Sequence, residues 1–448
     1  MPPELEDIRP PWSRSDRTVP RVVVRPLQEF LQTSTAAAFV LFGAIVVALA
    51  WANSPWRESY VSLWHTALAV RVGSVTIGSD LHFWINDGLM TLFFLVVGIE
   101  IKREFTIGEL RDRRAAALPA IAAVGGMLVP ALLFLAVVGS GDARKGWGIP
   151  MATDIALALG ALLLAARHAP AGLKPLLLTL AIVDDIGAIL VIAIFYPQGG
   201  NATELLGAVA LLGVIVLLQR LHVRATVVYV AIGIGVWYLT YRAGVHPTIA
   251  GVALGLLTPS VPFQRPAAVS AEARRTAEET VDDPTPPDVD AGSWLRLAWL
   301  SREAVSPLAR TEHALLPWTS FVVVPLFALA NAGVTLAGET LRRSMTERLG
   351  LAIVLGLVVG KPLGIAVAAR LSAATGVGRL PRDVGWGHIV GMGATAGIGF
   401  TIALFIAELA FPESPELLAQ AKVSILVGSV LAGVIGHVIL RAARRPAR

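Results

Sequence analysis

Long stretches without charged residues recur through this sequence and restrict what it can fold into. A helix needs roughly 20 mostly apolar residues to cross a bilayer, because its backbone polar groups must be satisfied internally. Only 15% of the 448 residues are Asp, Glu, Lys or Arg, and the mean hydropathy is +0.68. So little charge cannot cover the surfaces of several soluble domains. We therefore expect an all-α polytopic membrane protein.

Twelve apolar stretches are long enough, or nearly so, to span a membrane. They cover residues 35–53, 83–101, 116–138, 147–166, 174–196, 204–219, 225–242, 246–261, 314–335, 349–371, 385–411 and 417–440. Only a few residues separate spans 7 and 8, so the count is about twelve. The first stretch can also be interpreted as a signal peptide with a cleavage site at Ala48-Leu49-Ala50, but its leader is too long.

The other segments are two tails, a hairpin and an insertion. We expect a disordered cytoplasmic tail at 1–34 and a second cytoplasmic tail at 441–448. One transmembrane domain over 35–440 lies between them. Residues 68–78 alternate around a Gly-Ser turn, which predicts a β-hairpin. Residues 262–312 are polar, acidic and rich in Pro, which predicts a cytoplasmic loop that is mobile in its middle and amphipathic near Trp294 to Trp299.

Basic residues predict the orientation, because Lys and Arg are enriched in cytoplasmic loops. With the N-terminus inside, the inner segments hold 27 of the 37 Lys and Arg residues, and the outer loops hold 9. Both termini should therefore be cytoplasmic. The one remaining basic residue is Lys361, inside span 10.

Several classes of function are excluded. The chain has no Cys, which rules out disulfides, thiol catalysis and Cys-ligated metals. A net charge of +5 over 448 residues is too dilute to indicate nucleic-acid binding. The run Gly356 to Lys361 is one residue short of a phosphate-binding loop, and Pro362 follows it, so an ATP-driven pump is not indicated. We expect neither an enzyme nor a bound cofactor.

The clearest set of charged residues inside the predicted spans is Asp154, Asp184, Asp185 and Lys361. Each costs on the order of 2.5–3.5 kcal/mol at a helix centre, so such residues usually mark ion paths. The alternative is an ion pair that only fixes packing, but one Lys cannot neutralise three carboxylates. Adjacent helical residues point about 100° apart. One Asp of the pair can therefore face a site shared with Asp154 while the other faces Lys361.

Neighbouring carboxylates make protons and a cation compete. Two carboxylates about 4–5 Å apart repel by roughly 4 kcal/mol at an effective dielectric constant of about 20, so they resist double ionisation unless a cation separates them. Three carboxylates and one Lys sum to −2. Two protons neutralise the set, whereas one monovalent cation leaves −1, so exchanging two protons for one cation moves net charge. In a second scheme Lys361 releases one of the protons, and the sequence leaves both schemes open.

Spans 4 and 11 are rich in residues that interrupt helices. Span 4 has two Gly and one Pro before Thr153, and span 11 has six Gly. Close helix packing is one explanation. The other is a pair of broken helices whose ends meet near the midplane, with Asp154 and Lys361 compensating their dipoles. Gly-Trp-Gly opens both spans, at 146–148 and 385–387, which hints at an inverted repeat of spans 3–5 and 10–12.

Six motifs occur in order along the chain. They are Phe-Phe-Leu-Val-Val-Gly-Ile-Glu-Ile-Lys-Arg-Glu (93–104), Ala-Thr-Asp-Ile-Ala (152–156), Ala-Ile-Val-Asp-Asp-Ile-Gly-Ala-Ile (181–189), Pro-Leu-Phe-Ala-Leu-Ala-Asn-Ala-Gly-Val (325–334), Val-Gly-Lys-Pro-Leu-Gly-Ile (359–365) and Gly-Ile-Gly-Phe-Thr-Ile (397–402). The chain resembles the NhaA family of bacterial sodium–proton antiporters through these motifs, from about residue 30 to 440. The resemblance implies twelve spans, with a core of spans 3–5 and 10–12, an interface of spans 1–2 and 6–9, and crossed, interrupted spans 4 and 11.

The resemblance also implies residue roles. Asp185 is the primary sodium carboxylate, Asp184 shares this transient Na⁺ site and pairs with Lys361, and Thr153 and Asp154 belong to the crossing. The implied activity is a pH-regulated, electrogenic exchange of Na⁺ or Li⁺ for more than one proton, serving pH and sodium homeostasis. The implied setting is the bacterial inner membrane, in a homodimer formed through the hairpin. The partners are then the lipid bilayer, Na⁺ and H⁺.

Five residues are candidates for the pH response. Four match family positions at the cytoplasmic mouth: Glu100, Glu104, Glu312 and His313. His246 is added because it opens span 8 and an imidazole titrates near neutral pH. The chain departs from the family pattern at Leu316, where a second His is expected, and its insertion is longer and more acidic. A cation channel or a sodium-coupled solute symporter using the same carboxylates is the alternative function.

Overall fold

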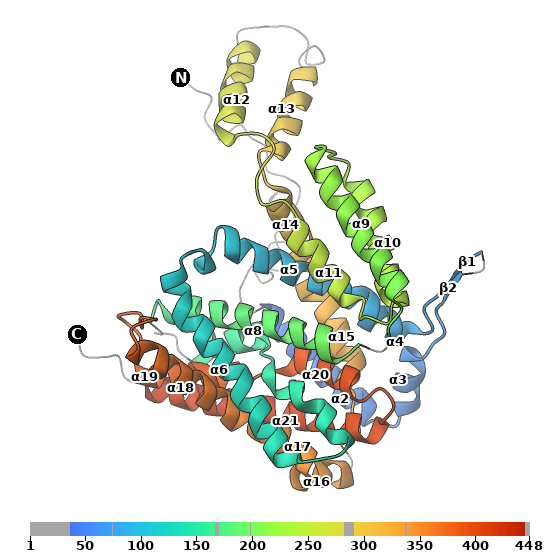
Figure 1. Cartoon of the computed structure of the whole chain (residues 1–448), viewed down its shortest axis with the longest axis vertical. Helices are drawn as coiled ribbons and strands as arrows, with labels where there is room; N and C mark the ends of the chain where they lie inside the picture. The colour runs from blue at the N-terminus through green and yellow to red at the C-terminus, as the bar shows by residue number, and fades with distance from the viewer. Residues whose placement is uncertain are drawn as a thin grey trace, which may run out of the picture.

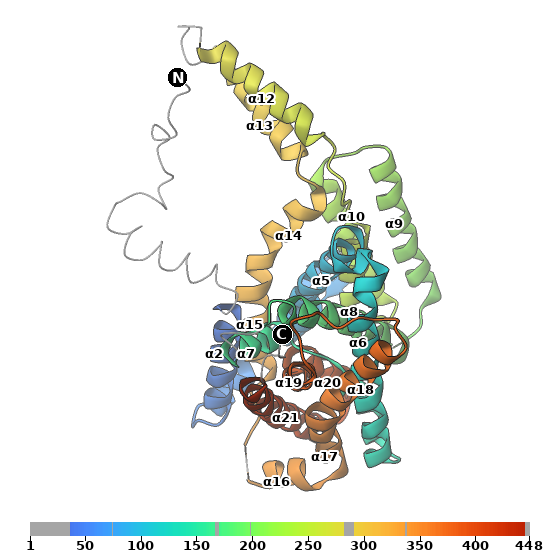
Figure 2. The same cartoon turned by 90° about the vertical axis from the view of Figure 1, so that its left-hand side faces the viewer.

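The chain forms a bundle of apolar helices, seen here in a computed structural model that describes residues 36–73, 75–165, 170–197, 199–281, 291–336 and 338–443. A two-stranded hairpin projects from one side of the bundle (Figure 1), and two helices of the insertion project from another part of it (Figures 1 and 2). We call these the hairpin end and the insertion end. The predicted tail 1–34, most of the tail 441–448 and the middle of the insertion lie outside the described residues.

Helices make up nearly all of the described chain. The elements of the first half are α2 (Ala36–Ala52), α3 (Arg57–Trp64), β1 (Val70–Val72), β2 (Val75–Ile77), α4 (Leu81–Phe83), η4 (Trp84–Leu89), α5 (Met90–Thr106), η5 (Glu109–Arg111), α6 (Arg113–Val138), η6 (Asp142–Met151), α7 (Ile155–Ala165), α8 (Leu173–Phe195) and α9 (Ala202–Arg220). Those of the second half are α10 (Thr226–Arg242), α11 (Thr248–Leu257), α12 (Pro266–Val281), α13 (Ala291–Glu303), α14 (Pro307–Trp318), η7 (Thr319–Val323), α15 (Val324–Asn331), α16 (Gly338–Thr346), α17 (Arg348–Leu355), η8 (Gly356–Gly360), α18 (Lys361–Ala374), α19 (Trp386–Ala396), α20 (Phe400–Ala410) and α21 (Pro415–Ala442).

The all-α membrane fold predicted from the sequence is confirmed. Each of the twelve predicted spans falls on helix. In the described part of the chain, 7 helices are long and apolar enough to cross a membrane, or up to 10 when each bent pair counts as one span. Helices α10 and α11 have only 17 and 10 residues, so they are shorter than an ordinary span. The number twelve therefore stays a prediction.

Two sets of helices pack mainly within themselves. Helix α6 lies against α8 and α18, and α21 lies against α17 and α19. In the other set α5 lies along α11, α9 along α10, and α2 along α15. Small residues permit the closest of these contacts, as membrane helices often require. A Cβ on Gly255 would lie 2.8 Å from the backbone of Gly98, so α5 and α11 approach backbone to backbone.

The predicted hairpin is present. Strands β1 and β2 pair antiparallel, with Val70 opposite Ile77. Asp80 fixes its base, because the Asp80 carboxylate accepts a hydrogen bond of 2.9 Å from the Phe83 N–H and lies 2.9 Å from Nδ1 of His65. The hairpin is thereby held on the start of the helix that continues through η4 into α5.

The insertion differs from the loop expected between spans 8 and 9. Residues on both sides of its undescribed middle form helices α12 and α13, which project from the bundle (Figures 1 and 2). The prediction of a loop rested on the Pro and acidic residues in the middle of the insertion. The segment before them is rich in Ala, Glu and Arg, which favour helix. Glu303 ties the insertion to the bundle through Arg224 at 3.5 Å and Arg310 at 3.4 Å. The predicted mobility of residues 282–290 lies outside the described residues.

Spans 4 and 11 are interrupted where the Gly and Pro residues predicted it. Helices η6 and α7 are bent by 48° at the first break, and α19 and α20 by 45° at the second. The two breaks touch, because the Asp154 N–H donates to the Ile398 carbonyl oxygen over 2.7 Å. A Cβ on Gly399 would lie 2.7 Å from the Ala152 carbonyl oxygen. Two interrupted helices that cross at their breaks are thus confirmed.

The crossing should not tolerate a methyl group at Gly399. Gly399→Ala places a Cβ against rigid backbone and should destabilise the protein by about 1–3 kcal/mol, as overpacking usually does. Thermal unfolding in detergent measures the loss. Gly433→Ala is the control, because its nearest neighbour is the flexible end of Ile398 at 3.3 Å. Equal melting temperatures for the two variants would contradict the packing described here.

The hairpin base should respond to pH in a defined direction. Burial raises the pKa of Asp80, but hydrogen bonds from the Phe83 N–H and His65 outweigh it and lower that pKa below its ordinary value. The stability from such a carboxylate is present above its unfolded pKa and is lost as pH falls through the lowered value. Asp80→Ala should lower the free energy of opening the hairpin base by about 0.5–2 kcal/mol. The loss should be the same at pH 6 and pH 9, because the Asp80 carboxylate is ionised at both. Hydrogen–deuterium exchange over residues 66–83 checks this, and unchanged exchange would refute it.

Candidate functional site

A buried ion pair lies at the centre of the candidate site. Asp184 is in the middle of α8, and Lys361 begins α18 directly after the π-helical turn η8. Both side chains are 0% exposed, and Lys361 Nζ donates to Asp184 Oδ2. Turns of π-helix are rare and often mark functional positions, because they shift a side chain relative to a regular helix. The structure thus brings together the pair that the family resemblance implied.

Thr153 connects this pair to the crossing. Its hydroxyl oxygen lies 2.5 Å from Asp184 Oδ2 and 3.0 Å from the Ala396 carbonyl oxygen at the end of α19. Thr153 sits in the extended break of span 4, where the backbone leaves the side chain free to reach both. One side chain therefore contacts α8 and both interrupted spans.

Asp154 caps two half-helices at once. Asp154 Oδ1 accepts a hydrogen bond of 3.0 Å from the Leu157 N–H in the first turn of α7. Asp154 Oδ2 accepts one of 3.2 Å from the Thr401 N–H in the first turn of α20, and the Thr401 hydroxyl donates to the same oxygen. Helix starts leave N–H groups unpaired and carry partial positive charge. Asp154 therefore compensates two positive helix ends.

Lys361 serves the opposite kind of helix end. Besides its bond to Asp184, Nζ donates to the carbonyl oxygen of Met151, the last residue of η6. Helix ends leave carbonyl groups unpaired and carry partial negative charge, which a cation compensates. The dipole compensation expected of Asp154 and Lys361 is therefore found at three half-helix ends.

Asp185 is buried beside this pair without a comparable partner. Its side chain is on α8, the residue is 3% exposed, and Oδ1 has no hydrogen-bond partner among the described residues. Asp184 Oδ1 also has no hydrogen-bond partner among the described residues. The charged groups near enough to affect Asp185 are Asp184, Glu100, Asp154 and Lys361. Because Lys361 is bonded to Asp184, the charge of Asp185 is the one that the site leaves uncompensated.

Two groups of the site were not predicted from the sequence. Thr401 lies in the quoted motif Gly-Ile-Gly-Phe-Thr-Ile, but only its position two residues after Gly399 could have marked it as the first turn of a half-helix. The Met151 carbonyl oxygen is a backbone atom, so its role cannot be predicted from the residue type. Pro150 just before it was the available signal, since Pro ends or distorts the helix around it.

The pH-response candidates separate into a cluster and two outlying residues. Arg103 Nη1 lies 2.5 Å from Glu312 Oε1, which joins α5 to α14, and Arg103 Nη2 lies 3.9 Å from Glu104. Glu100 lies one helical turn before Arg103 and Glu104 on α5. It is within the electrostatic influence of both and of Glu312. Arg103, the centre of this cluster, was not among the candidates predicted from the sequence.

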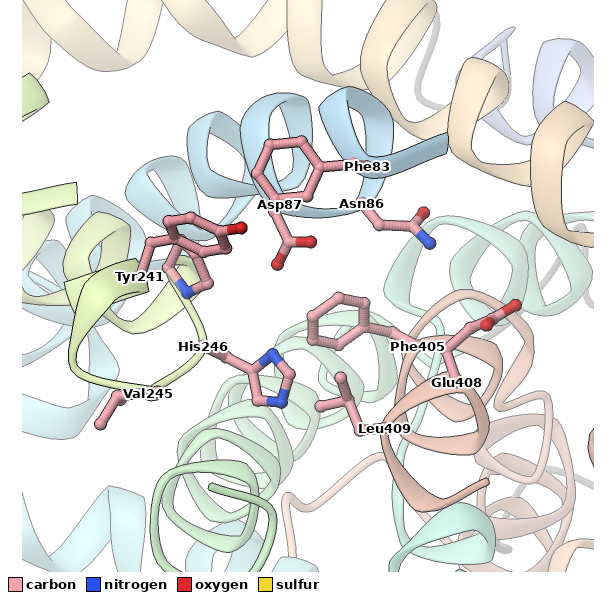
Figure 3. Close-up of a pocket in the computed structure, with 11 residues that line it drawn as sticks. Phe83, Asn86, Asp87, Tyr241, Val245, His246, Phe405, Glu408 and Leu409 are labelled. Carbon is pink, nitrogen blue, oxygen red and sulfur yellow. The ribbon is translucent and has the colours of Figure 1, made fainter. Parts of the chain in front are cut away.

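Neither candidate His belongs to the cluster. His313 is exposed next to Glu312. His246 is 7% exposed at the hairpin end, where its Nε2 lies 3.1 Å from the Tyr196 carbonyl oxygen. His246 also borders a cavity between Asp87 and Phe405 (Figure 3). The five candidates therefore lie in at least two separate parts of the bundle.

The arrangement suits reversible binding of protons and a small cation. A buried carboxylate oxygen with no hydrogen-bond partner is unfavourable unless a proton or cation satisfies it. Asp184 and Asp185 each present one such oxygen. The charged groups beside them, Asp154 and Lys361, are bonded to helix ends. A change in the occupant of Asp185 therefore changes the net charge at the point where the two interrupted helices cross.

Comparison with known proteins gives a family for this arrangement. The family described as Na+/H+ antiporter 1 matches residues 28–440. "Na(+)/H(+) antiporter NhaA 2" of Sorangium cellulosum is 50% identical over 436 residues, covering 96% of this chain and 92% of the relative. The protein of the same name from Myxococcus xanthus is 45% identical, covering 95% and 92%. "Na(+)/H(+) antiporter NhaA" of Cupriavidus necator is 41% identical, covering 97% and 94%. The chain therefore belongs to the NhaA family of Na⁺/H⁺ antiporters.

Proposed function

We propose that this protein exports Na⁺, and also Li⁺, in electrogenic exchange for more than one proton. The observation that carries the proposal is the buried Asp185 carboxylate, unpartnered beside the Asp184–Lys361 pair. Asp185 binds either the cation or a proton, so the two ions exclude each other. The site belongs to the chain itself and uses no cofactor.

Asp184 completes the cation site in this proposal. Asp184 Oδ1 has no hydrogen-bond partner among the described residues and can bind the cation together with Asp185 Oδ1. Asp184 Oδ2 stays bonded to Thr153 and Lys361. Drawing Asp184 toward a cation weakens its hold on Lys361. The second proton then comes either from the carboxylates together or from Lys361, as in the two schemes based on the sequence.

Alternating access follows from the position of the site at the crossing. The core of α6–α8 and α17–α21 moves against the interface formed by α2–α5, α9–α11 and α14–α15. Polar contacts at the breaks replace continuous helix hydrogen bonds, so small rotations can expose Asp185 to either side. The hairpin end faces the periplasm and the insertion end the cytoplasm, which agrees with the excess of Lys and Arg in the inner loops. The chain then resides in the bacterial inner membrane with both termini inside.

The cluster around Arg103 provides the pH response. The ion pair between Arg103 and Glu312 joins α5 to α14, so a change in this cluster acts on how the two helices pack. Glu100 and Glu104 add two further carboxylates near Arg103. His246 and His313 act apart from this cluster. The β1–β2 hairpin forms the homodimer contact, because a two-stranded ribbon presents unpaired edges to a second copy.

Replacing the unpartnered carboxylate should abolish exchange. Asp185→Asn keeps the size of the side chain, but the amide neither takes up a proton nor carries the negative charge that attracts a cation. Na⁺-dependent proton flux into proteoliposomes should therefore disappear. Asp142→Asn is the control, since the Asp142 side chain is 77% exposed and pairs with Lys145 at the surface. Retained flux in Asp185→Asn would contradict the assignment. Flux that persists without coupling to protons would indicate a channel, and a need for an organic solute would indicate a symporter.

The exchange should depend on membrane potential. If each cycle moves one net positive charge inward, a negative-inside potential drives it with about 2.3 kcal/mol per 100 mV. The steady-state Na⁺ gradient should then change on the order of 50-fold per 100 mV. Potentials set with K⁺ and valinomycin in proteoliposomes measure this. A rate and a gradient that do not respond to voltage would exclude the proposed stoichiometry.

A further inference from the structure

A cavity of about 330 Å³ lies at the hairpin end of the bundle. Its walls come from α4 and η4, from the end of α10 and the turn that follows it, and from α20. Helix α20 belongs to the core and the other elements to the interface, so the cavity lies between the two sets of helices. Sites for small organic molecules usually measure about 300–1,000 Å³. The cavity therefore has room for one small organic molecule, whereas a bare ion would leave most of it unfilled.

Three aromatic rings form part of the cavity wall, and they come from three different elements. They are Phe83 of α4, Tyr241 of α10 and Phe405 of α20. Phe83 and Tyr241 contact each other edge to face, with ring centroids 5.2 Å apart, and Trp237 stacks on Tyr241 at 6.2 Å. Phe405 contacts the ring of His246 at 6.4 Å. Aromatic rings held in this way attract a cation to their faces and pack against apolar groups.

The half-buried Asp87 carboxylate points into the cavity (Figure 3). Only its backbone is occupied, since the Asp87 carbonyl oxygen accepts hydrogen bonds from Trp237 Nε1 over 2.8 Å and from Thr91 Oγ1 over 2.6 Å. No hydrogen bond or ion pair reaches the Asp87 carboxylate from the described residues. A carboxylate that is partly shielded from water and unpaired is unfavourable, and a cation with N–H donors would compensate it.

The other polar groups of the cavity wall add an acceptor but no second uncompensated charge. Glu408 Oε1 lies 2.5 Å from Lys422 Nζ, so this carboxylate already has its counter-charge. His246 Nε2 lies 3.1 Å from the Tyr196 carbonyl oxygen. Because a carbonyl oxygen can only accept, Nε2 carries the proton, and Nδ1 of the neutral ring is an acceptor. Figure 3 shows this second ring nitrogen turned toward the hollow.

We propose that this cavity binds a small organic ammonium ion, a primary amine with an apolar body. The ammonium group donates to the Asp87 carboxylate and to His246 Nδ1, and the apolar body lies against the rings of Phe83, Tyr241 and Phe405. A neutral molecule of the same shape leaves the Asp87 charge uncompensated, and that charge repels an anion. The bound amine contacts the core through α20 and the interface through α4 and α10.

Phenethylamine is a suitable probe, because an alkylammonium group keeps its proton at pH 8 and the phenyl ring matches the aromatic wall. Calorimetric titration of the unmodified protein in detergent, without Na⁺, should show saturable binding with a Kd of about 1 mM or tighter. Phenethyl alcohol has the same body without the charge and should not saturate over the same range. Absence of amine binding, or equal binding of amine and alcohol, would overturn the proposal.

Two variants separate the charge from the rings. Asp87→Asn removes the charge at constant size and should weaken amine binding about ten- to a hundredfold, as loss of a hydrogen bond to a charged group does. Tyr241→Leu removes one ring and should weaken it about two- to tenfold. Asp142→Asn, at the exposed pair with Lys145, should bind the amine normally. Unchanged affinity in a folded Asp87→Asn protein contradicts the site. If that variant unfolds, the comparison of amine with alcohol still decides the role of charge.

The absence of native Cys allows the bound amine to be located. Val245→Cys places a single thiol on the cavity wall, and Ser62→Cys places one on the exposed surface of α3. At about ten times the Kd of the amine, methanethiosulfonate modification of Val245→Cys should slow about tenfold, because only the free protein reacts. Modification of Ser62→Cys should not change. Binding that leaves Val245→Cys unprotected would place the amine elsewhere and overturn the cavity as its site.

The outcome is separable from the test of antiport, since binding and protection are measured without Na⁺ and without a pH gradient. In the Asp185→Asn background transport is expected to be lost, but the amine should bind with unchanged affinity. Failure of the amine to bind overturns this site and leaves antiport untouched. Absence of Na⁺/H⁺ exchange in the unmodified protein overturns the proposed function, while the titration still decides whether the cavity holds an ammonium ion.

Discussion

Two interrupted helices can cross inside a bilayer only if the peptide groups freed at their ends find partners within the protein, because no lipid group can supply them. Asp154 meets this requirement for the starts of α7 and α20, and Lys361 meets it for the end of η6. Gly399 lets the two breaks approach until backbone bonds to backbone. The crossing is stable because charges that are costly in hydrocarbon are used where helix ends supply opposite partial charges.

The same requirement determines which charge is left for transport. Lys361 is shared between a helix end and Asp184, and Asp154 is occupied by two helix starts. Among the described residues Asp185 Oδ1 then has no hydrogen-bond partner, although Asp185 is as deeply buried as the others. A carboxylate in this position gains most from a proton or a cation. In our proposal the structural use of three charges is therefore what makes the fourth one available for exchange.

Contacts between the two sets of helices are of a different kind from those within them. Within a set, small residues bring helices together, as at Gly98 and Gly255. Across the boundary at the hairpin end, a cavity and a 4.0 Å approach of His82 Nε2 to Glu408 Oε1 replace close packing. Polar contacts that water can replace are weaker than packed apolar contacts. A boundary of this kind suits the sliding that alternating access needs.

Much of this protein was accessible from the sequence. Apolar stretches of membrane length predicted the helices, and clustered Gly and Pro predicted both breaks, because these properties depend on the residue type and its neighbours along the chain. The scarcity of charge in those stretches identified Asp154, Asp184, Asp185 and Lys361 without any structure. The insertion shows the limit of such patterns, since its Pro-rich middle hid the helix-forming residues on either side.

The partners of these residues were decided only by the tertiary structure. Residue type could not tell which Asp of the pair faces Lys361, since that depends on how α8 is rotated against α18. It could not show that Asp154 caps two helices, that Thr153 reaches Asp184, or that Arg103 joins Glu312. Each of these contacts unites segments far apart in the chain. The sequence by itself determined where charge is buried and where helices break, and the packing of the helices decided which charge remains without a partner.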